Sequence, residues 1–208
     1  MKKKIKQTKR HSLDFTFLSI FILLIIIIII NSSFKIANVK KYSPANDERG
    51  ADTLYKPKKK DILLFYIQLS ENHNIIVYDI NYNADKTVNA SQPVHTYWIR
   101  YSEKGQNKEL TYFQRHLVYG LETKLIDKEK QAYTLEFVSY KKKKIYLSKT
   151  KVDNKYNAYM DIHGKISLLS KIFIQVEPRT FGLPTVKYVD LYGKEISTNS
   201  TITERIIP

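Results

Sequence analysis

The feature that most constrains this chain is an uncharged apolar run from Phe15 to Ile30, which includes six consecutive isoleucines. Six Lys/Arg side chains precede it within residues 1–11. At about 1.5 Å per residue, a helix over this run spans roughly 24 Å, and its extension to Phe34 reaches about 30 Å, the thickness of a bilayer's hydrocarbon core. We therefore expect residues 15–34 to cross a membrane rather than form a buried core helix.

The residues around this run predict the topology. The segment Asn31-Ser32-Ser33 is a poor match to an A-x-A-like cleavage site, so an uncleaved anchor is favoured over a cleaved signal peptide. The excess of positive charge before the run leaves the N-terminus in the cytoplasm and the rest of the chain outside it. This orientation argues against nucleic acid as a partner, although the pI is about 9.7.

The chain divides into three parts. Residues 1–34 would form the basic tail and the transmembrane anchor or signal peptide. Residues 35–60 are charged, contain two prolines and lack a sustained apolar period, so we expect a flexible tether. Residues 61–208 are long enough for one hydrophobic core and would form an extracytoplasmic β domain.

Period-two alternation dominates from Asp61 onward, for example between Ile166 and Val176, and is typical of half-buried strands. Further candidate strands are Ile62–Leu69, Asn74–Ile80, Val94–Tyr101, Tyr133–Tyr140, Ile145–Ser148, Tyr156–Ile162, Thr185–Leu191 and Thr201–Ile207. Because Ile62–Leu69 is apolar on both faces, we expect it at the centre of a sheet. Short polar connections, including Lys141–Lys144 as a solvated hairpin tip, predict an all-β antiparallel sandwich or barrel-like meander.

One segment departs from this alternation. Between Glu109 and Tyr119, apolar side chains recur at helical spacing, and Gly120 stands where a helix C-cap is expected. The sequence therefore predicts one α-helix packed on the sheet, in addition to the N-terminal transmembrane or signal helix.

Several classes of chemistry are excluded by composition and motif. The chain has no Cys, which removes disulfides, thiolate metal sites and cysteine nucleophiles. The run Asp79, Asn81, Asn83 and Asp85 begins like a calcium loop, but it lacks the required Gly and Glu further on, so we interpret it as a turn. The five histidines have no metal-ligand spacing, and nucleotide-binding and hydrolase motifs are absent. We predict no cofactor, no metal and no assignable catalytic residue.

Aromatic and basic side chains gather in two stretches, a candidate strand near Trp98 and the expected helix. If these elements pack together, an arginine could hold an anion by its planar fork while aromatic rings stack on a ligand. The alternative is that the rings are core and the charged groups reach into solvent. The candidate ligand-binding residues are His95, Tyr97, Trp98, Arg100, Arg115, His116 and Tyr119.

Five stretches together resemble a known family. They are PVHTYWIRYSEKG (Pro93–Gly105), LTYFQRHLVYG (Leu110–Gly120), KIFIQV (Lys171–Val176), GLPTVKYVDLYG (Gly182–Gly193) and ERI (Glu204–Ile206). Over roughly Asn72–Pro208 the chain resembles the domain of unknown function 4833, an uncharacterised family of exported bacterial proteins, seen mainly in Bacteroidota. The resemblance implies export into a Gram-negative envelope and supplies no catalytic residue.

Three functional hypotheses follow. The favoured one is an inner-membrane, single-pass protein whose periplasmic β domain, or exported domain if the signal is cleaved, binds an envelope ligand or protein partner without catalysis. The alternative is an envelope hydrolase or transferase on an anionic or glycan substrate, with His95 or His116 as acid or base, Arg115 as anion clamp and Glu103 or Glu136 as partner carboxylate. The third is a structural role in which an exposed strand edge receives another protein.

Overall fold

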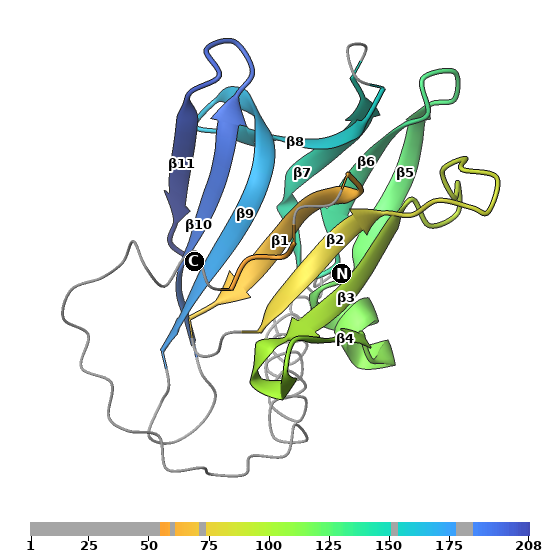
Figure 1. Ribbon diagram of the computed structural model, residues 1–208. Helices are drawn as coiled ribbons and strands as arrows, with labels where there is room; N and C mark the ends of the chain where they lie inside the picture. The colour runs from red at the N-terminus through yellow and green to blue at the C-terminus, as the bar shows by residue number, and fades with distance from the viewer. Residues whose placement is uncertain (1–54, 59–60, 71–73, 151–153, 178–184) are drawn as a thin grey trace, which may run out of the picture. The chain divides into compact units, whose positions relative to one another are not determined.

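The computed structural model describes residues 55–58, 61–70, 74–150, 154–177 and 185–208 (Figure 1). The predicted anchor, residues 1–34, and all but residues 55–58 of the predicted tether lie outside this described part. Within it, no helix has the length and apolar character needed to cross a membrane. The described part of the tether contacts the domain, because the Tyr101 hydroxyl donates to the Lys56 carbonyl at 2.6 Å.

The described chain is mostly β, as the alternation predicts, and its eleven strands belong to one sheet. The strands are β1 (Leu63–Leu69), β2 (Ile75–Ile80), β3 (Val94–Arg100), β4 (Gln106–Glu109), β5 (Leu121–Asp127), β6 (Ala132–Phe137), β7 (Tyr140–Lys149), β8 (Tyr156–Ile162), β9 (Lys165–Glu177), β10 (Thr185–Glu195) and β11 (Thr201–Ile206). Their order is β4-β3-β2-β1-β9-β8-β7-β6-β5, and β10 also pairs with β9 and carries β11.

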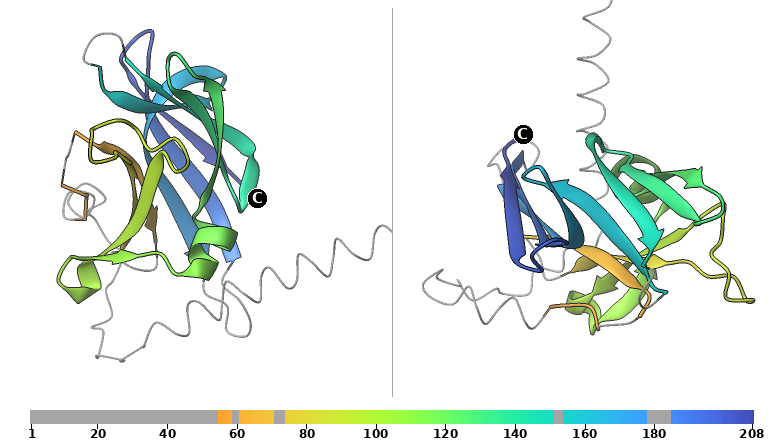
Figure 2. Two further views of the ribbon diagram at one scale, coloured as in Figure 1. Left: turned by 90° about the vertical axis from the view of Figure 1, so that its right-hand side faces the viewer. Right: turned by 90° about the horizontal axis from the view of Figure 1, so that it is seen from above.

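The sheet divides into two wings at β9. One edge of β9 pairs with β10 from Ser167 to Glu177. The other edge is shared, because residues 165–168 pair with β8 and residues 171–174 pair with β1. The first wing, β1–β4, and the second wing, β5–β8, therefore diverge from the same strand and curl into an open half-barrel (Figures 1 and 2). The parallel β1–β9 pair departs from the purely antiparallel meander that the sequence predicts.

The main hydrophobic core includes side chains from both wings. Phe65 and Tyr78 of the first wing stack with their ring centroids 4.4 Å apart. Leu135 and Leu147 of the second wing are fully buried in the same cluster. Burying side chains of this size contributes roughly 1.5–3 kcal/mol each. The core therefore supplies the main reason for the two wings to face each other.

A smaller apolar cluster covers the outer face of the first wing. Tyr66, Ile75, Val77 and Tyr97 are buried there. β1 and β2 are apolar on both faces because each face has its own cluster, and β1 lies between β2 and β9. The predicted central position of Ile62–Leu69 is confirmed.

A glycine is required where β10 passes close to β8 and β9, at the point where the two wings separate. A Cβ on Gly193 of β10 would lie 2.8 Å from both the Leu168 carbonyl oxygen and the Ile162 Cδ1 atom. Real Cβ atoms do not approach backbone atoms so closely. Gly193 thus permits β10 to pass the point at which the two wings separate.

The predicted packed α-helix over 109–119 is wrong. The segment holds a short helical stretch with a π-turn at Gln114–Val118, in which the Tyr119 N–H donates to the Gln114 carbonyl at 2.8 Å. Thr111 and Gln114 form a reciprocal capping box, so the helical stretch starts at Tyr112, three residues later than predicted. Gly120 and β5 follow at once and leave no room for further turns.

Three strand assignments also differ from expectation. β4 and β5 were not expected, because β4 is polar and exposed throughout and the apolar residues of β5 are mostly exposed and show no alternation. The lysines 141–144 lie inside β7 rather than at a hairpin tip. Three of them form ion pairs, including one of 2.6 Å between Lys141 and Glu122 of β5, and this pairing lets a strand tolerate four consecutive cations.

Candidate functional site

The alternation of β3 sends the predicted site residues to opposite faces of the sheet. Trp98 points into the main core, where its Nε1–H donates to the buried Gln114 at 3.3 Å and its ring meets Tyr119 edge-on. His95 and Tyr97 lie on the outer face and stack on each other at 5.1 Å between ring centroids. The predicted aromatic cluster is thus split by the sheet itself.

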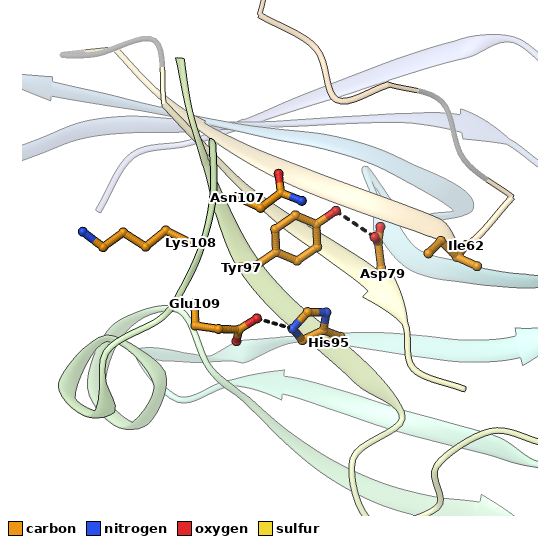
Figure 3. A pocket seen from close by; sticks show the side chains of 7 residues that line it. All are labelled: Ile62, Asp79, His95, Tyr97, Asn107, Lys108 and Glu109. Carbon is orange, nitrogen blue, oxygen red and sulfur yellow. Dashed lines mark hydrogen bonds and ion pairs between the residues drawn. The ribbon is translucent and has the colours of Figure 1, made fainter. Parts of the chain in front are cut away.

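Glu109 joins two of the predicted site residues. The β3–β4 register pairs Tyr97 with Glu109, and this brings the Glu109 carboxylate beside the neighbouring His95. The His95 Nε2–H donates to Glu109 Oε1 at 2.7 Å (Figure 3). The Arg115 guanidinium donates to the other oxygen, Oε2, at 3.1 Å. A single carboxylate therefore holds an imidazole from the sheet and a guanidinium from the helical stretch, and we call these three residues the Glu109 cluster.

A second polar pair lies beside this cluster. The Tyr97 hydroxyl donates to Asp79 Oδ2 at 2.9 Å, and both residues are buried. Burial raises the pKa of the Tyr97 phenol well above its ordinary value, and the hydrogen bond to Asp79 and the charges of Asp79 and Glu109 raise it further. The phenol therefore remains a neutral hydrogen-bond donor across the physiological pH range.

A hollow of about 290 Å³ lies on the outer face at this point. Figure 3 shows its lining residues, which come from β2, β3, β4 and the residue before β1. They are Ile62, Asp79, His95, Tyr97, Asn107, Lys108 and Glu109. The side chains that face one another here include two carboxylates, an imidazole, a phenol and an amide, whereas the Lys108 side chain points away from them (Figure 3), so the hollow is suited to a small polar ligand rather than to an apolar one.

A second hollow, of about 400 Å³, lies between β3 and β5. Arg115 and His116 line it from the helical stretch, and the Glu122 carboxylate together with hydroxyl, amide and apolar groups completes it. The other lining residues are Ser91, Gln92, Val94, Thr96, Gly120, Leu121, Glu122, Thr123 and Val138. Arg115 therefore lines this second hollow while its bond to Glu109 ties it to the lining of the first.

His116 contacts a carbonyl rather than a carboxylate. Its Nδ1 lies 2.8 Å from the Tyr112 carbonyl oxygen, and its ring stacks on that of Tyr112 at 4.1 Å. Because a carbonyl only accepts, Nδ1 carries the hydrogen, and Nε2 is the acceptor in the neutral ring. His116 and His95 line different hollows, so the structure does not bring the two histidines to one site.

The remaining predicted residues are engaged elsewhere. The Tyr119 ring packs against Trp98, and its carbonyl accepts a hydrogen bond of 2.8 Å from the Tyr78 hydroxyl. Arg100 donates to Glu103 at 2.7 Å. Glu136, the other carboxylate proposed as a catalytic partner, pairs with Lys144 at 3.4 Å. Neither Glu103 nor Glu136 is the carboxylate that His95 contacts.

Sequence reasoning missed Glu109 and Asp79 as members of the site. Glu109 would have emerged only from the β3–β4 register, since no apolar pattern marks β4. Asp79 was considered only as the start of a calcium loop. In the structure it bonds Tyr97, while Asp85 and Thr87 close a turn with a 2.6 Å bond. Among the described residues, no three His, Asp or Glu side chains are placed to share a metal ion.

Glycine 120 fixes the geometry of the helical stretch that carries Arg115. A Cβ at this position would lie 1.6 Å from the Arg115 carbonyl oxygen, which no side chain can satisfy. Gly120 also accepts a hydrogen bond from the Val138 N–H at 3.1 Å, which connects the end of the stretch to the second wing. The position of Arg115 between the wings thus depends on a residue without a side chain.

Comparison with known proteins gives one match. No curated protein and no solved structure matches the chain. The family described as domain of unknown function 4833 matches residues 65–205, which include the Glu109 cluster, all of the second hollow, and both wings and the first hollow except for residues 62–64. The chain therefore belongs to the family of the domain of unknown function 4833.

Proposed function

We propose that this protein is a membrane-tethered binding module of a bacterial envelope, without catalytic activity of its own. Residues 15–34 hold it in the inner membrane with the N-terminus in the cytoplasm, and the β domain faces the periplasm, or is exported if the signal is cleaved. The charge pattern around the apolar run and the resemblance to exported proteins of Bacteroidota support this topology.

The Glu109 cluster is the observation that carries the binding role. Arg115 uses one amino group on Glu109, and among the described residues no other acceptor contacts its guanidinium. Its remaining N–H donors match the planar fork that recognises carboxylate or phosphate. The His95 imidazole bonds the same carboxylate and places a second basic group beside Arg115. The favoured ligand is therefore an anionic envelope molecule or an anionic group on a protein partner.

Native mass spectrometry of the full-length chain, purified from membranes in mild detergent, tests this proposal. We expect a reproducible adduct that is lost in Arg115→Met and kept in Lys187→Met, which removes a cation paired with Glu177 on the β9–β10 hairpin. Loss of the adduct in both variants would show that binding depends on the net charge of the protein and not on Arg115 in particular. A bare chain in every preparation would count against a ligand and favour a protein partner.

A hydrolase or transferase is the second candidate, and one contact favours it. The 2.7 Å bond between His95 and Glu109 fixes the imidazole as a carboxylate does in general acid–base catalysis. The separation of His95 and His116 into two hollows argues against it, because the two candidate acid–base residues do not line one site. Turnover of an anionic glycan that disappears in His95→Gln and survives in His116→Gln would establish this alternative.

A further inference from the structure

β5 is an exposed edge strand. It stands at the end of the strand order and pairs only with β6 among the described strands. All of its residues between Glu122 and Ile126 are exposed, including the apolar Leu125 at 45% and Ile126 at 52%. An exposed edge strand with apolar side chains is a template for pairing with another strand.

At every second residue of β5, the backbone N–H and C=O groups point to this free edge. The Val138 N–H donates to the Gly120 carbonyl, so Gly120 turns its polar groups toward β6. In an antiparallel ladder this direction repeats at every second residue, so Glu122 and Lys124 also turn toward β6. The N–H and C=O groups of Leu121, Thr123 and Leu125 then point away from β6, into the space beside the strand.

The side chains of β5 make this edge complementary to itself. The sequence from Leu121 to Leu125 reads Leu-Glu-Thr-Lys-Leu. When a second copy of this sequence runs antiparallel about Thr123, Glu122 lies opposite the partner's Lys124 and Leu121 lies opposite the partner's Leu125. Cross-strand pairs of opposite charge and of apolar residues are the units that stabilise antiparallel sheets.

We propose that two copies of this chain pair through β5, antiparallel and centred on Thr123. The backbone directions select this register. After a shift by one residue, a residue whose N–H and C=O point to the free edge would lie opposite a partner residue whose N–H and C=O point toward β6, and the two could not form hydrogen bonds. A shift by two residues would place Glu122 opposite the partner's Glu122, or Lys124 opposite the partner's Lys124, and like charges in direct opposition are unfavourable. Glu122 already receives Lys141 at 2.6 Å, and a carboxylate has room for a second donor.

The pairing would place a partner strand beside the hollow between β3 and β5, because Leu121, Glu122 and Thr123 of the pairing segment also line this hollow. In the proposed register the partner's Leu125 lies opposite Leu121, which follows Gly120 directly and is close in sequence to Arg115 and His116. The pairing does not require the proposed ligand and goes beyond the binding role.

A single engineered cysteine tests the pairing, because the chain has no Cys of its own. In the proposed register Thr123 faces the partner's Thr123 across about 5.5 Å between Cα atoms, a separation that a disulfide spans. With the full-length chain in mild detergent, we expect Thr123→Cys to form a disulfide-linked dimer about tenfold faster than Thr203→Cys. Thr203 is the matched control, since it is also exposed and lies on an edge strand, β11, which pairs with β10 alone among the described strands.

Charge reversal tests the register in the same background. In Thr123→Cys chains, Lys124→Glu alone and Glu122→Lys alone should each slow cross-linking several-fold, and a mixture of the two should restore it as a heterodimer identified by mass. Equal cross-linking at positions 123 and 203, or no preference for the heterodimer, would overturn the proposal. A disulfide from position 123 to a different protein, with no homodimer, would show that another protein pairs with the β5 edge, and this result would also overturn the proposal.

Discussion

Two carboxylates in this domain hold basic partners in opposite ways. Asp190 of β10 is buried, with 6% of its side chain exposed, and it accepts two hydrogen bonds of 2.7 Å from Arg205, whose guanidinium lies over the Tyr188 ring. Glu109 of β4 is 62% exposed and divides its two oxygens between His95 and Arg115. The first carboxylate has both oxygens committed to one partner, whereas the second connects two elements at the surface.

The difference separates a structural ion pair from one that can exchange partners. A buried carboxylate that loses its cation remains desolvated, and this cost ties the Asp190–Arg205 pair to the fold. An exposed carboxylate is rehydrated when its partner leaves, so Arg115 can turn from Glu109 to an incoming anion at small cost. The contrast between burial and exposure is consistent with the proposal that the Glu109 cluster binds an anion.

The largest expected effect comes from the structural pair. Arg205→Met keeps much of the apolar stem but leaves Asp190 buried without its cation, and we expect the melting temperature to fall by roughly 5–10 °C. Differential scanning calorimetry at pH 7 measures this change. The double variant Arg205→Met/Asp190→Asn should recover part of the loss. An unchanged melting temperature in Arg205→Met would show that the buried Asp190–Arg205 pair does not stabilise the fold more than the exposed Glu109 cluster does.

A smaller effect is expected where the backbone positions the exposed cluster. Gly120→Ala forces the Arg115 carbonyl away from the new Cβ, and we expect a loss of about 1–3 kcal/mol in the free energy of unfolding. Chemical denaturation measures it. Binding of the anionic adduct should weaken as well, although neither charged residue is changed. Full stability together with full binding would show that the helical stretch does not need its close approach at Gly120.

Glu204 provides an intermediate case that titrates. Burial alone would raise its pKa, but hydrogen bonds from Lys143 and the His163 N–H, together with their charges, lower the pKa below 4.5. A carboxyl with a lowered pKa stabilises the fold at pH above its unfolded value, and this contribution disappears as the pH falls through the folded pKa. The wild-type chain should therefore melt at a higher temperature than Glu204→Gln at pH 7, by roughly 3 °C, and the difference should shrink below pH 4.5. Melting curves between pH 3 and pH 7 measure it, and a constant difference would assign the effect to packing.

The smallest change in stability is expected at the proposed binding residue. Arg115→Met removes one exposed ion pair, so the free energy of unfolding should change by about 1 kcal/mol or less. The same variant should lose the anionic adduct. A large loss of stability with unchanged binding would place Arg115 with Arg205, as a structural residue.

The sequence predicts much of this fold because most strands bury one face. Strands such as β8, whose exposure alternates from Tyr156 to Ile162, carry their own period and were predicted with the same bounds. β4 and β5 bury no face, so nothing in their side chains marks them. The π-turn at Gln114–Val118 was mistaken for an α-helix because its apolar spacing is helical, while its length is limited by the backbone contact at Gly120.

The candidate site was predicted in its parts but not in its arrangement. His95 and Arg115 were singled out from their chemistry, and the structure joins them through a carboxylate that sequence reasoning did not consider. Glu109 lies 14 residues from His95, and their contact depends on the β3–β4 register, which no local pattern encodes. The alternative that the sequence analysis weighed, in which the aromatic rings are core, holds for Trp98, which is buried in the main core, and Tyr119 is partly buried against that core.

The branch at β9 has a consequence for the order of folding. The second wing joins β9 through successive hairpins, so its pairings connect residues that are near each other in the chain. The first wing joins β9 only through β1, where Tyr66 pairs with Lys171, more than 100 residues later. Contacts between residues so far apart in sequence are slow to form. When the chain is synthesised from its N-terminus, β1 to β4 therefore cannot pair with β9 until β9 has been made. The two wings then pack against each other only after their own strands have paired.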